Sequence, residues 1–190
     1  MLIAIVAVAM LVHAALALQF ARITPFRQSG ILLSQRDPAT GRPQRVLDVG
    51  APDERQHLNY VAHLADGKGF PVFDPKAPDL AESYQSHQPP LAYAIYALLV
   101  GHPDGPMARF PSAIFGALIV AGCAAAGLWG SQVRGFAAGM ALAVAPWPML
   151  CALSGAVSND PLLIALITWG FALLLRMANG RWTFGGAALF

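Results

Sequence analysis

The chain has 190 residues, of which 56% are hydrophobic and 12% are charged, and its mean hydropathy is +0.54. These values exclude an ordinary soluble domain of this length and indicate that a lipid bilayer is the solvent for much of the chain. The net charge of +2, without any stripe of basic and aromatic residues, gives no reason to expect a nucleic-acid partner.

The first predicted element is a transmembrane helix over residues 1–20, which form an uninterrupted apolar run. About 20 residues, rising roughly 1.5 Å each, are needed to cross the hydrocarbon of a bilayer. No basic residues precede the run, although Ala15-Leu16-Ala17 is similar to a signal-peptide cleavage site. An uncleaved span and a signal peptide both remain open, and we favour the span.

Residues 21–109 form a hydrophilic loop that carries nine of the ten carboxylates and four of the five histidines. Two surface helices are predicted within this loop, over residues 53–66 and 89–100. The first has apolar residues at i, i+3, i+4 and i+7, a pattern typical of a helix lying along a membrane surface. The second is too short to span and is expected to be interfacial or re-entrant. The apolar face of the first comprises Leu58, Val61, Ala62 and Ala65, and its polar face comprises Gln56, Asn59 and His63.

Asp53 and Glu54 open the first surface helix, and His57 and Tyr60 follow Asp53 on one stripe at i+4 and i+7. Asp53 with Gln56 three residues later resembles a capping box, so a purely structural role as a helix cap is one interpretation. The other interpretation is chemical. A carboxylate held ionised at a helix amino terminus can take a proton from a hydroxyl group or hold a divalent cation.

Two further candidates lie at the ends of predicted helices. His87 and Gln88 precede Pro89-Pro90 at the start of the second surface helix, and Arg109 immediately precedes the next apolar run. His87 is compatible with an ordinary surface histidine, and Arg109 with an arginine that extends its charge out of the membrane. The functional alternative for Arg109 is a contact with a lipid phosphate, which suits the forked donors of a guanidinium.

Three more spans and the start of a fifth, at residue 183, occupy residues 110–190. Pro146 and Pro148 predict a kink near the end of the third span. We therefore predict an all-α, polytopic membrane protein with four transmembrane helices and the beginning of a fifth, and we expect the chain to be the front piece of a longer protein. The predicted bounds of spans two to four are 110–130, 135–153 and 161–177.

Asp160 stands alone between the third and fourth spans, directly before Pro161. This pair is typical of a helix start, but an acid in such a place is costly unless it reaches water or a partner. Short loops rich in Lys and Arg stay cytoplasmic, which places both Asp53 and Asp160 on the outer face of the membrane, where they could share one outward cavity. The basic residues that fix this orientation are Arg134, Arg176 and Arg181.

Three other side chains in the apolar runs have simpler interpretations. Cys123 and Cys151 are expected at different depths, beyond disulfide reach. His13 is the only ionisable side chain well inside a span, and a neutral, packed histidine is favoured over a proton relay.

Four motifs lie in order along the chain, each at the start of a predicted helix or just before it. They are Pro52-Asp53-Glu54, His87-Gln88-Pro89-Pro90-Leu91, Ala108-Arg109-Phe110-Pro111-Ser112-Ala113 and Ser158-Asn159-Asp160-Pro161-Leu162. Their order and spacing against the spans resemble the amino-terminal part of GT-C glycosyltransferases of the protein mannosyltransferase and lipid A aminoarabinose transferase type. The resemblance covers nearly all of this chain and about the first third of such an enzyme.

The resemblance implies a polyprenyl-phosphate sugar donor and an acceptor reached from the outer face. Asp53 would be the acid that activates the acceptor, with Glu54 beside it, and Asp160 matches a second acid of the outer loops. These three are the predicted catalytic residues. His87 and Gln88 stand where many relatives have a lysine before Pro-Pro, so Arg109 would take over part of the phosphate contact. The predicted substrate-binding residues are His57, Tyr60, His87, Gln88 and Arg109.

The leading hypothesis is therefore a membrane glycosyltransferase that works with inversion, with membrane lipid around it and a glycan, lipid or protein as acceptor. The alternatives are a polytopic transporter or flippase component, for which acids inside the spans would speak, and a non-enzymatic membrane assembly protein. No obligatory cofactor is expected. A divalent cation remains open, because Asp53, His57 and Asp160 could make a metal site.

Overall fold

The computed structural model describes residues 1–27, 34–36, 43–45, 51, 53–78 and 80–180, so the predicted start of a fifth span at residue 183 lies outside it. The chain divides into two compact units, which we call the bundle unit and the polar unit. The bundle unit comprises Met1–Phe20, Ser112–Gly155 and Asp160–Phe190, and the polar unit comprises Ala21–Pro111 and Ala156–Asn159.

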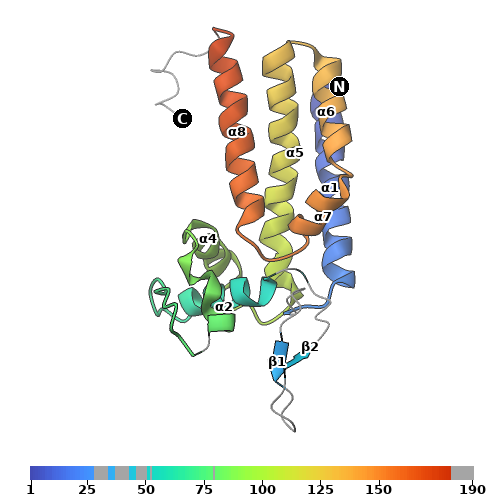
Figure 1. Cartoon of the computed structure of the whole chain (residues 1–190). Helices are drawn as coiled ribbons and strands as arrows, with labels where there is room; N and C mark the ends of the chain where they lie inside the picture. The colour runs from blue at the N-terminus through green and yellow to red at the C-terminus, as the bar shows by residue number, and fades with distance from the viewer. Residues whose placement is uncertain (28–33, 37–42, 46–50, 52, 79, 181–190) are drawn as a thin grey trace. The chain divides into compact units, whose positions relative to one another are not determined.

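The described part of the fold is helical, as the sequence predicts, apart from one antiparallel pair of three-residue strands (Figure 1). These strands, β1 (Ser34–Arg36) and β2 (Pro43–Arg45), lie within the predicted hydrophilic loop, outside its two predicted helices.

Three helices among the described residues are long and apolar enough to cross a membrane. A further pair of helices, bent by 67° at a short break, makes either a broken span or a re-entrant loop, and would raise the number of spans to four if it crosses as one. The kink predicted from Pro146 and Pro148 is thus confirmed. Its cause is that a proline cannot donate the backbone hydrogen bond that would continue the helix. The long helices are α1 (Leu2–Ile23), α5 (Phe110–Ser131) extended at its start by the 3₁₀ turn η2 (Pro106–Arg109), and α8 (Asp160–Ala178), and the bent pair is α6 (Arg134–Val144) and α7 (Pro148–Ser154).

Small side chains hold the bundle unit together. Helix α5 lies beside α1 and α6 on one side and beside α8 on the other (Figure 1). Gly122 of α5 faces Thr168 and Trp169 of α8 so closely that an added Cβ would lie 2.9 Å from the Thr168 methyl carbon. Such small residues let membrane helices approach each other. On the other side, one cluster of buried residues contains Ala9, Val120, Ala124, Ala141 and Ala145.

His13 of α1 is fully buried at the break between α6 and α7. Its Nδ1 lies 2.9 Å from the carbonyl oxygen of Ala145, and its Nε2 lies 3.1 Å from the hydroxyl of Ser154. A neutral imidazole satisfies both partners, with Nδ1–H donating to the carbonyl and Nε2 accepting from the hydroxyl. His13 is therefore packed and hydrogen-bonded, as the sequence favoured. Cys123 and Cys151 are both free thiols.

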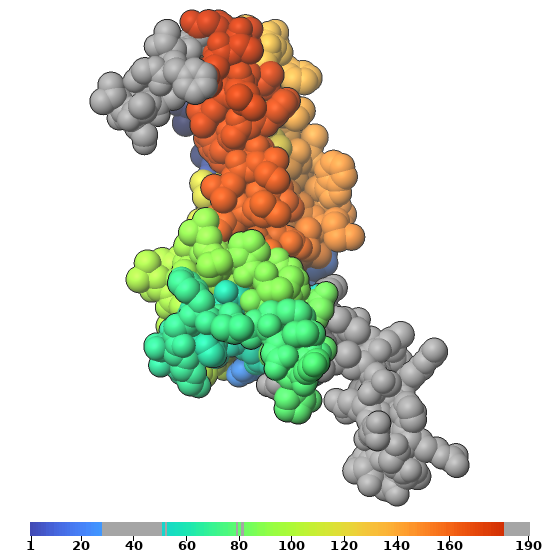
Figure 2. Space-filling view, turned by 60° about the vertical axis from the view of Figure 1, so that its left-hand side comes forward, coloured from blue at the N-terminus to red at the C-terminus, as the bar shows by residue number. Residues whose placement is uncertain are grey.

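The polar unit is built around α2 (Glu54–Ala65), which packs against α4 (Leu91–Val100) and against α3 (Leu80–Ser83) with the 3₁₀ turn η1 (Tyr84–His87). Residues of these four elements form one continuous surface in the space-filling view (Figure 2). The predicted division of α2 into an apolar and a polar face is wrong at two positions. Gln56 is buried at 4% exposure and Ala65 is exposed, because α2 is covered by neighbouring elements on more than one side.

Candidate functional site

Asp53 occupies the N-cap position of α2 with φ 56° and ψ 5°, a left-handed backbone conformation. Its side chain makes no cap hydrogen bond, so the capping-box interpretation is wrong. The reason lies in the backbone, since an N-cap residue normally adopts the extended conformation that turns its side chain toward the first amides of the helix. Left-handed residues other than glycine are uncommon and gather at functional sites, although aspartate and asparagine tolerate this conformation better than other side chains. Asp53 is half-buried.

Glu54 and Arg109 form a bidentate ion pair inside the polar unit. Arg109 Nε donates to Glu54 Oε1 over 2.6 Å, and Nη2 donates to Oε2 over 2.5 Å. The two side chains are 0% and 1% exposed, respectively. Two such charges are tolerated in the interior only when each is paired and hydrogen-bonded, a condition that this geometry meets.

The remaining donors of Arg109 are also occupied. Its Nη1 donates to the carbonyls of Ala21 and Thr24, and its Nη2 donates to that of Pro25, over 2.5, 2.8 and 2.9 Å. With the two bonds to Glu54, all five N–H groups of the guanidinium have acceptors within the chain. The side chain is therefore held inside the protein and does not extend toward the membrane surface, which corrects the structural alternative drawn from the sequence. This geometry suits an anchor better than a phosphate ligand.

Three side chains of the polar unit hold the segment of residues 156–159. The Val157 amide donates to Glu54 Oε1 over 3.0 Å, so the same carboxylate serves Arg109 and this segment. Tyr96 of α4 donates its hydroxyl to the Ser158 carbonyl over 3.1 Å. The side-chain amide of Asn159 donates to Gln88 over 3.2 Å. The start of α2, the start of α4 and this segment are thereby fixed against one another.

His57 and Tyr60 of α2 face Tyr93 of α4. The ring of Tyr60 stacks on that of Tyr93 with centroids 4.0 Å apart, and His57 Nδ1 lies 2.8 Å from the Tyr93 hydroxyl. Burial lowers the pKa of His57 from 6.5 to about 4, so the ring is neutral at pH 7. Burial also raises the pKa of Tyr60, which keeps its phenol protonated. These residues can donate or accept hydrogen bonds without adding charge.

His87 and Gln88 lie at the surface next to the start of α4. His87 is exposed, with Nδ1 2.6 Å from the Tyr84 carbonyl and Nε2 3.0 Å from the Gln88 side-chain nitrogen. Because Gln88 also accepts from Asn159, the three side chains form one chain of hydrogen bonds. Neutral His87 fits this pattern as a donor at Nδ1 and an acceptor at Nε2.

Asp160 is the first residue of α8 and is exposed. It belongs to the bundle unit, whereas Asp53, Glu54 and Arg109 belong to the polar unit. The expected meeting of Asp53 and Asp160 in one cavity stays a prediction. Within the described ranges, no group of three or more His, Cys, Asp or Glu side chains is arranged to hold a metal ion.

Sequence reasoning did not single out the residues that hold the site together. Tyr96, Val157 and Asn159 receive their roles only from contacts between segments far apart in the chain. Tyr93 and Tyr96 did carry a signal, since their spacing of three puts both rings on one side of α4. The chain matches no family model, no curated protein and no solved structure.

Proposed function

We propose that the chain is part of a membrane glycosyltransferase that transfers a sugar from a polyprenyl phosphate to an acceptor on the outer face of a bacterial inner membrane. The observation that carries the proposal is the left-handed backbone of Asp53, which presents a half-buried carboxylate at the start of α2 without using it as a cap. The order of the four motifs, which resembles that of GT-C enzymes, supplies the reaction class.

In the proposed reaction, Asp53 takes the proton of an acceptor hydroxyl group, and the oxygen of that hydroxyl group attacks the anomeric carbon of the donor sugar. The bond between that carbon and the phosphate oxygen breaks, and polyprenyl phosphate leaves with the bonding electrons. Attack from the opposite side inverts the anomeric configuration. The chain thus has to orient one hydroxyl and to stabilise the charge that develops on the phosphate.

The contacts of the polar unit support different roles for the other candidates. Glu54 and Arg109 are positioning residues in this proposal, because their polar atoms are engaged with each other and with the backbone. Gln88 is proposed to donate to the donor phosphate through the second N–H of its side-chain amide, and exposed His87 is proposed to hold that amide in place. Asp160 is proposed as the second acid, and it follows Asn159 directly in the chain.

The test uses the full-length protein in proteoliposomes loaded with polyprenyl-phosphate donors that carry a labelled sugar, with an outer-membrane extract as acceptor source. The proposal predicts that label leaves the polyprenyl phosphate and that free polyprenyl phosphate accumulates. Donor that crosses the bilayer with its sugar still attached would identify a transporter. Donor that neither reacts nor moves would favour an assembly protein, and either result would contradict the proposal.

A further inference from the structure

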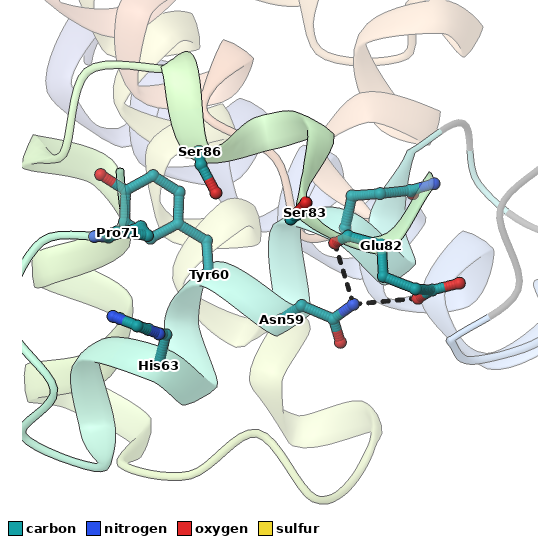
Figure 3. Close-up of a pocket in the computed structure, with 8 residues that line it drawn as sticks. Asn59, Tyr60, His63, Pro71, Glu82, Ser83 and Ser86 are labelled. Atoms are coloured by element: carbon teal, nitrogen blue, oxygen red, sulfur yellow. Dashed lines mark hydrogen bonds between the residues drawn. The ribbon is translucent and has the colours of Figure 1, made fainter. Parts of the chain in front are cut away.

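The polar unit contains a cavity of about 230 Å³ between α2, α3, η1 and the turn before α3 (Figure 3). Asn59 and Tyr60 of α2 line one side of this cavity, and Glu82 and Ser86 line the other. Pockets for drug-sized ligands span roughly 300–1,000 Å³. The cavity is therefore too small for a lipid chain or a peptide and has room for a single small ring.

The chemistry of the lining favours a neutral polyhydroxyl group over a phosphate. No lysine or arginine is present among the described residues that line the cavity, and Glu82 brings a negative charge. The Arg55 guanidinium that pairs with Glu82 only balances that charge, so a phosphate would gain little net attraction from the described lining. Ser86 instead offers a hydroxyl that can donate and accept, and Asn59 offers its side-chain oxygen as an acceptor, because both of its N–H groups are bound to Glu82.

Two of the lining groups are fixed before any ligand arrives. Asn59 Nδ2 donates to the Glu82 carboxylate over 3.0 Å and to the Glu82 carbonyl over 3.1 Å (Figure 3). The same carboxylate pairs with Arg55 Nε at 3.1 Å. Side chains held in this way lose little rotamer freedom when a ligand binds, which favours affinity.

Tyr60 supplies the apolar wall. Its ring projects among the polar groups of the cavity (Figure 3) and is held in place by stacking on Tyr93. Only 5% of Tyr60 is exposed, so the ring offers a small but rigid apolar contact, against which C–H groups of a sugar ring can pack at low entropy cost. Polar groups on two sides and an aromatic wall together match a ring that is apolar on its face and polar at its rim.

We propose that this cavity is a subsite for one sugar ring of the substrate, bound through Asn59, Ser86 and Glu82 against Tyr60. The assignment rests on the proposed function for the role of the bound sugar, and the lining residue Ser86 lies two positions before Gln88, the proposed phosphate contact, in the sequence. Binding itself can be measured without transfer, so the two claims are separable.

The experiment measures binding to the purified full-length protein by saturation-transfer NMR. The probes are the methyl glycosides of D-glucose, D-galactose, D-mannose and N-acetyl-D-glucosamine, with inorganic phosphate as the comparison. The test variants are Asn59→Ala and Glu82→Gln. Asp104→Asn is the matched control, since Asp104 is exposed and lies outside the cavity. Thermal unfolding is followed for every variant to establish that each is folded.

At least one glycoside is expected to bind saturably, with affinity about tenfold weaker in each test variant and unchanged in the control. Asn59→Ala removes an acceptor for a sugar hydroxyl, and Glu82→Gln replaces a charged acceptor by a weaker neutral one. Absence of saturable binding by all four glycosides, or equal affinity in wild type and folded variants, would overturn the subsite. Transfer abolished by Asp53→Asn with no glycoside binding would remove the subsite alone. Glycoside binding without any transfer would remove the proposed reaction and leave the subsite.

Discussion

Glu54 and Arg109, 55 residues apart in the sequence, are joined by two hydrogen bonds of 2.6 and 2.5 Å in the interior of the polar unit. Through Arg109 the pair reaches the carbonyls of Ala21, Thr24 and Pro25, and through Glu54 it reaches the amide of Val157. One buried pair thus joins the end of α1, the starts of α2 and α5, and the segment of residues 156–159.

Breaking this pair from one side should destabilise the protein strongly. Arg109→Met or Glu54→Gln leaves a buried charge without its partner, which should lower the free energy of unfolding by about 3–5 kcal/mol. The double variant Glu54→Leu with Arg109→Met should recover much of the loss, because no charge then remains buried. Denaturant titration of the purified protein in detergent micelles measures the change.

The control for this prediction is Glu82→Gln, which breaks the more exposed ion pair with Arg55. That change should cost at most about 1 kcal/mol. Equal losses in the control and in the single variants of the Glu54–Arg109 pair would show that the buried pair has no special structural role.

His57 should make the stability of the polar unit depend on pH. The unfolded chain protonates this histidine near pH 6.5, whereas the folded chain does so only near pH 4, because burial disfavours the charged ring. The contribution of His57 to the free energy of unfolding is fully present above pH 6.5. As the pH falls from 6.5 to 4 this contribution drops by up to about 3 kcal/mol, because the unfolded state binds the proton first.

The check is a series of unfolding titrations between pH 7.5 and 4 for wild type and His57→Gln. The variant should be less stable at pH 7.5, having lost its bond to Tyr93, yet should lose less stability on acidification. Lys76→Gln, an exposed change, serves as the control. An identical acid response in wild type and His57→Gln would disprove the role of this histidine.

Gly116 of α5 should tolerate no side chain. A Cβ at this position would collide with Ser154 Oγ and His13 Nε2 at the break between α6 and α7. Gly116→Ala should therefore cost about 1–3 kcal/mol through overpacking. Gly139→Ala is the matched control, since no atom lies within 4 Å of the added Cβ, and a helix gains up to about 1 kcal/mol from alanine. Thermal unfolding compares the two, and a Gly116→Ala protein as stable as wild type would contradict the packing described.

The orientation of the chain can be read by labelling in cells. In a background with both native cysteines replaced by alanine, Lys76→Cys should react with a membrane-impermeant maleimide from outside, once the outer membrane is permeabilised. Gln132→Cys, in the turn between α5 and α6, should react only after the inner membrane is opened. The reverse pattern would place the polar unit in the cytoplasm and remove the proposed access to an outer acceptor.

The elements with local causes were predictable from the sequence. Apolar periodicity predicted α2, Pro89-Pro90 predicted the start of α4, and Pro146 with Pro148 predicted the bend after α6. The Glu54–Arg109 pair was not predictable, because nothing in a single sequence says which of several acids meets which base across 55 residues. The left-handed turn at Asp53 was hidden for a different reason, since aspartate before a helix is far more often an extended cap.

The burial of Gln56 has a similar explanation. The helical period correctly predicts that Gln56 lies on the polar face of α2. It does not predict whether other elements cover that face. Elements α3 and η1 cover that side, and they are too short to leave a periodic signal of their own.

Asp53→Asn in the full-length protein tests the central claim most directly. Asparagine keeps the shape of the side chain and tolerates a left-handed backbone, so folding should be preserved while the proton acceptor is lost. The initial rate of sugar transfer from the labelled polyprenyl phosphate should fall about 100- to 10,000-fold, whereas Asp74→Asn, an exposed change in the same unit, should keep the wild-type rate. A folded Asp53→Asn protein that transfers sugar at the wild-type rate would contradict the account.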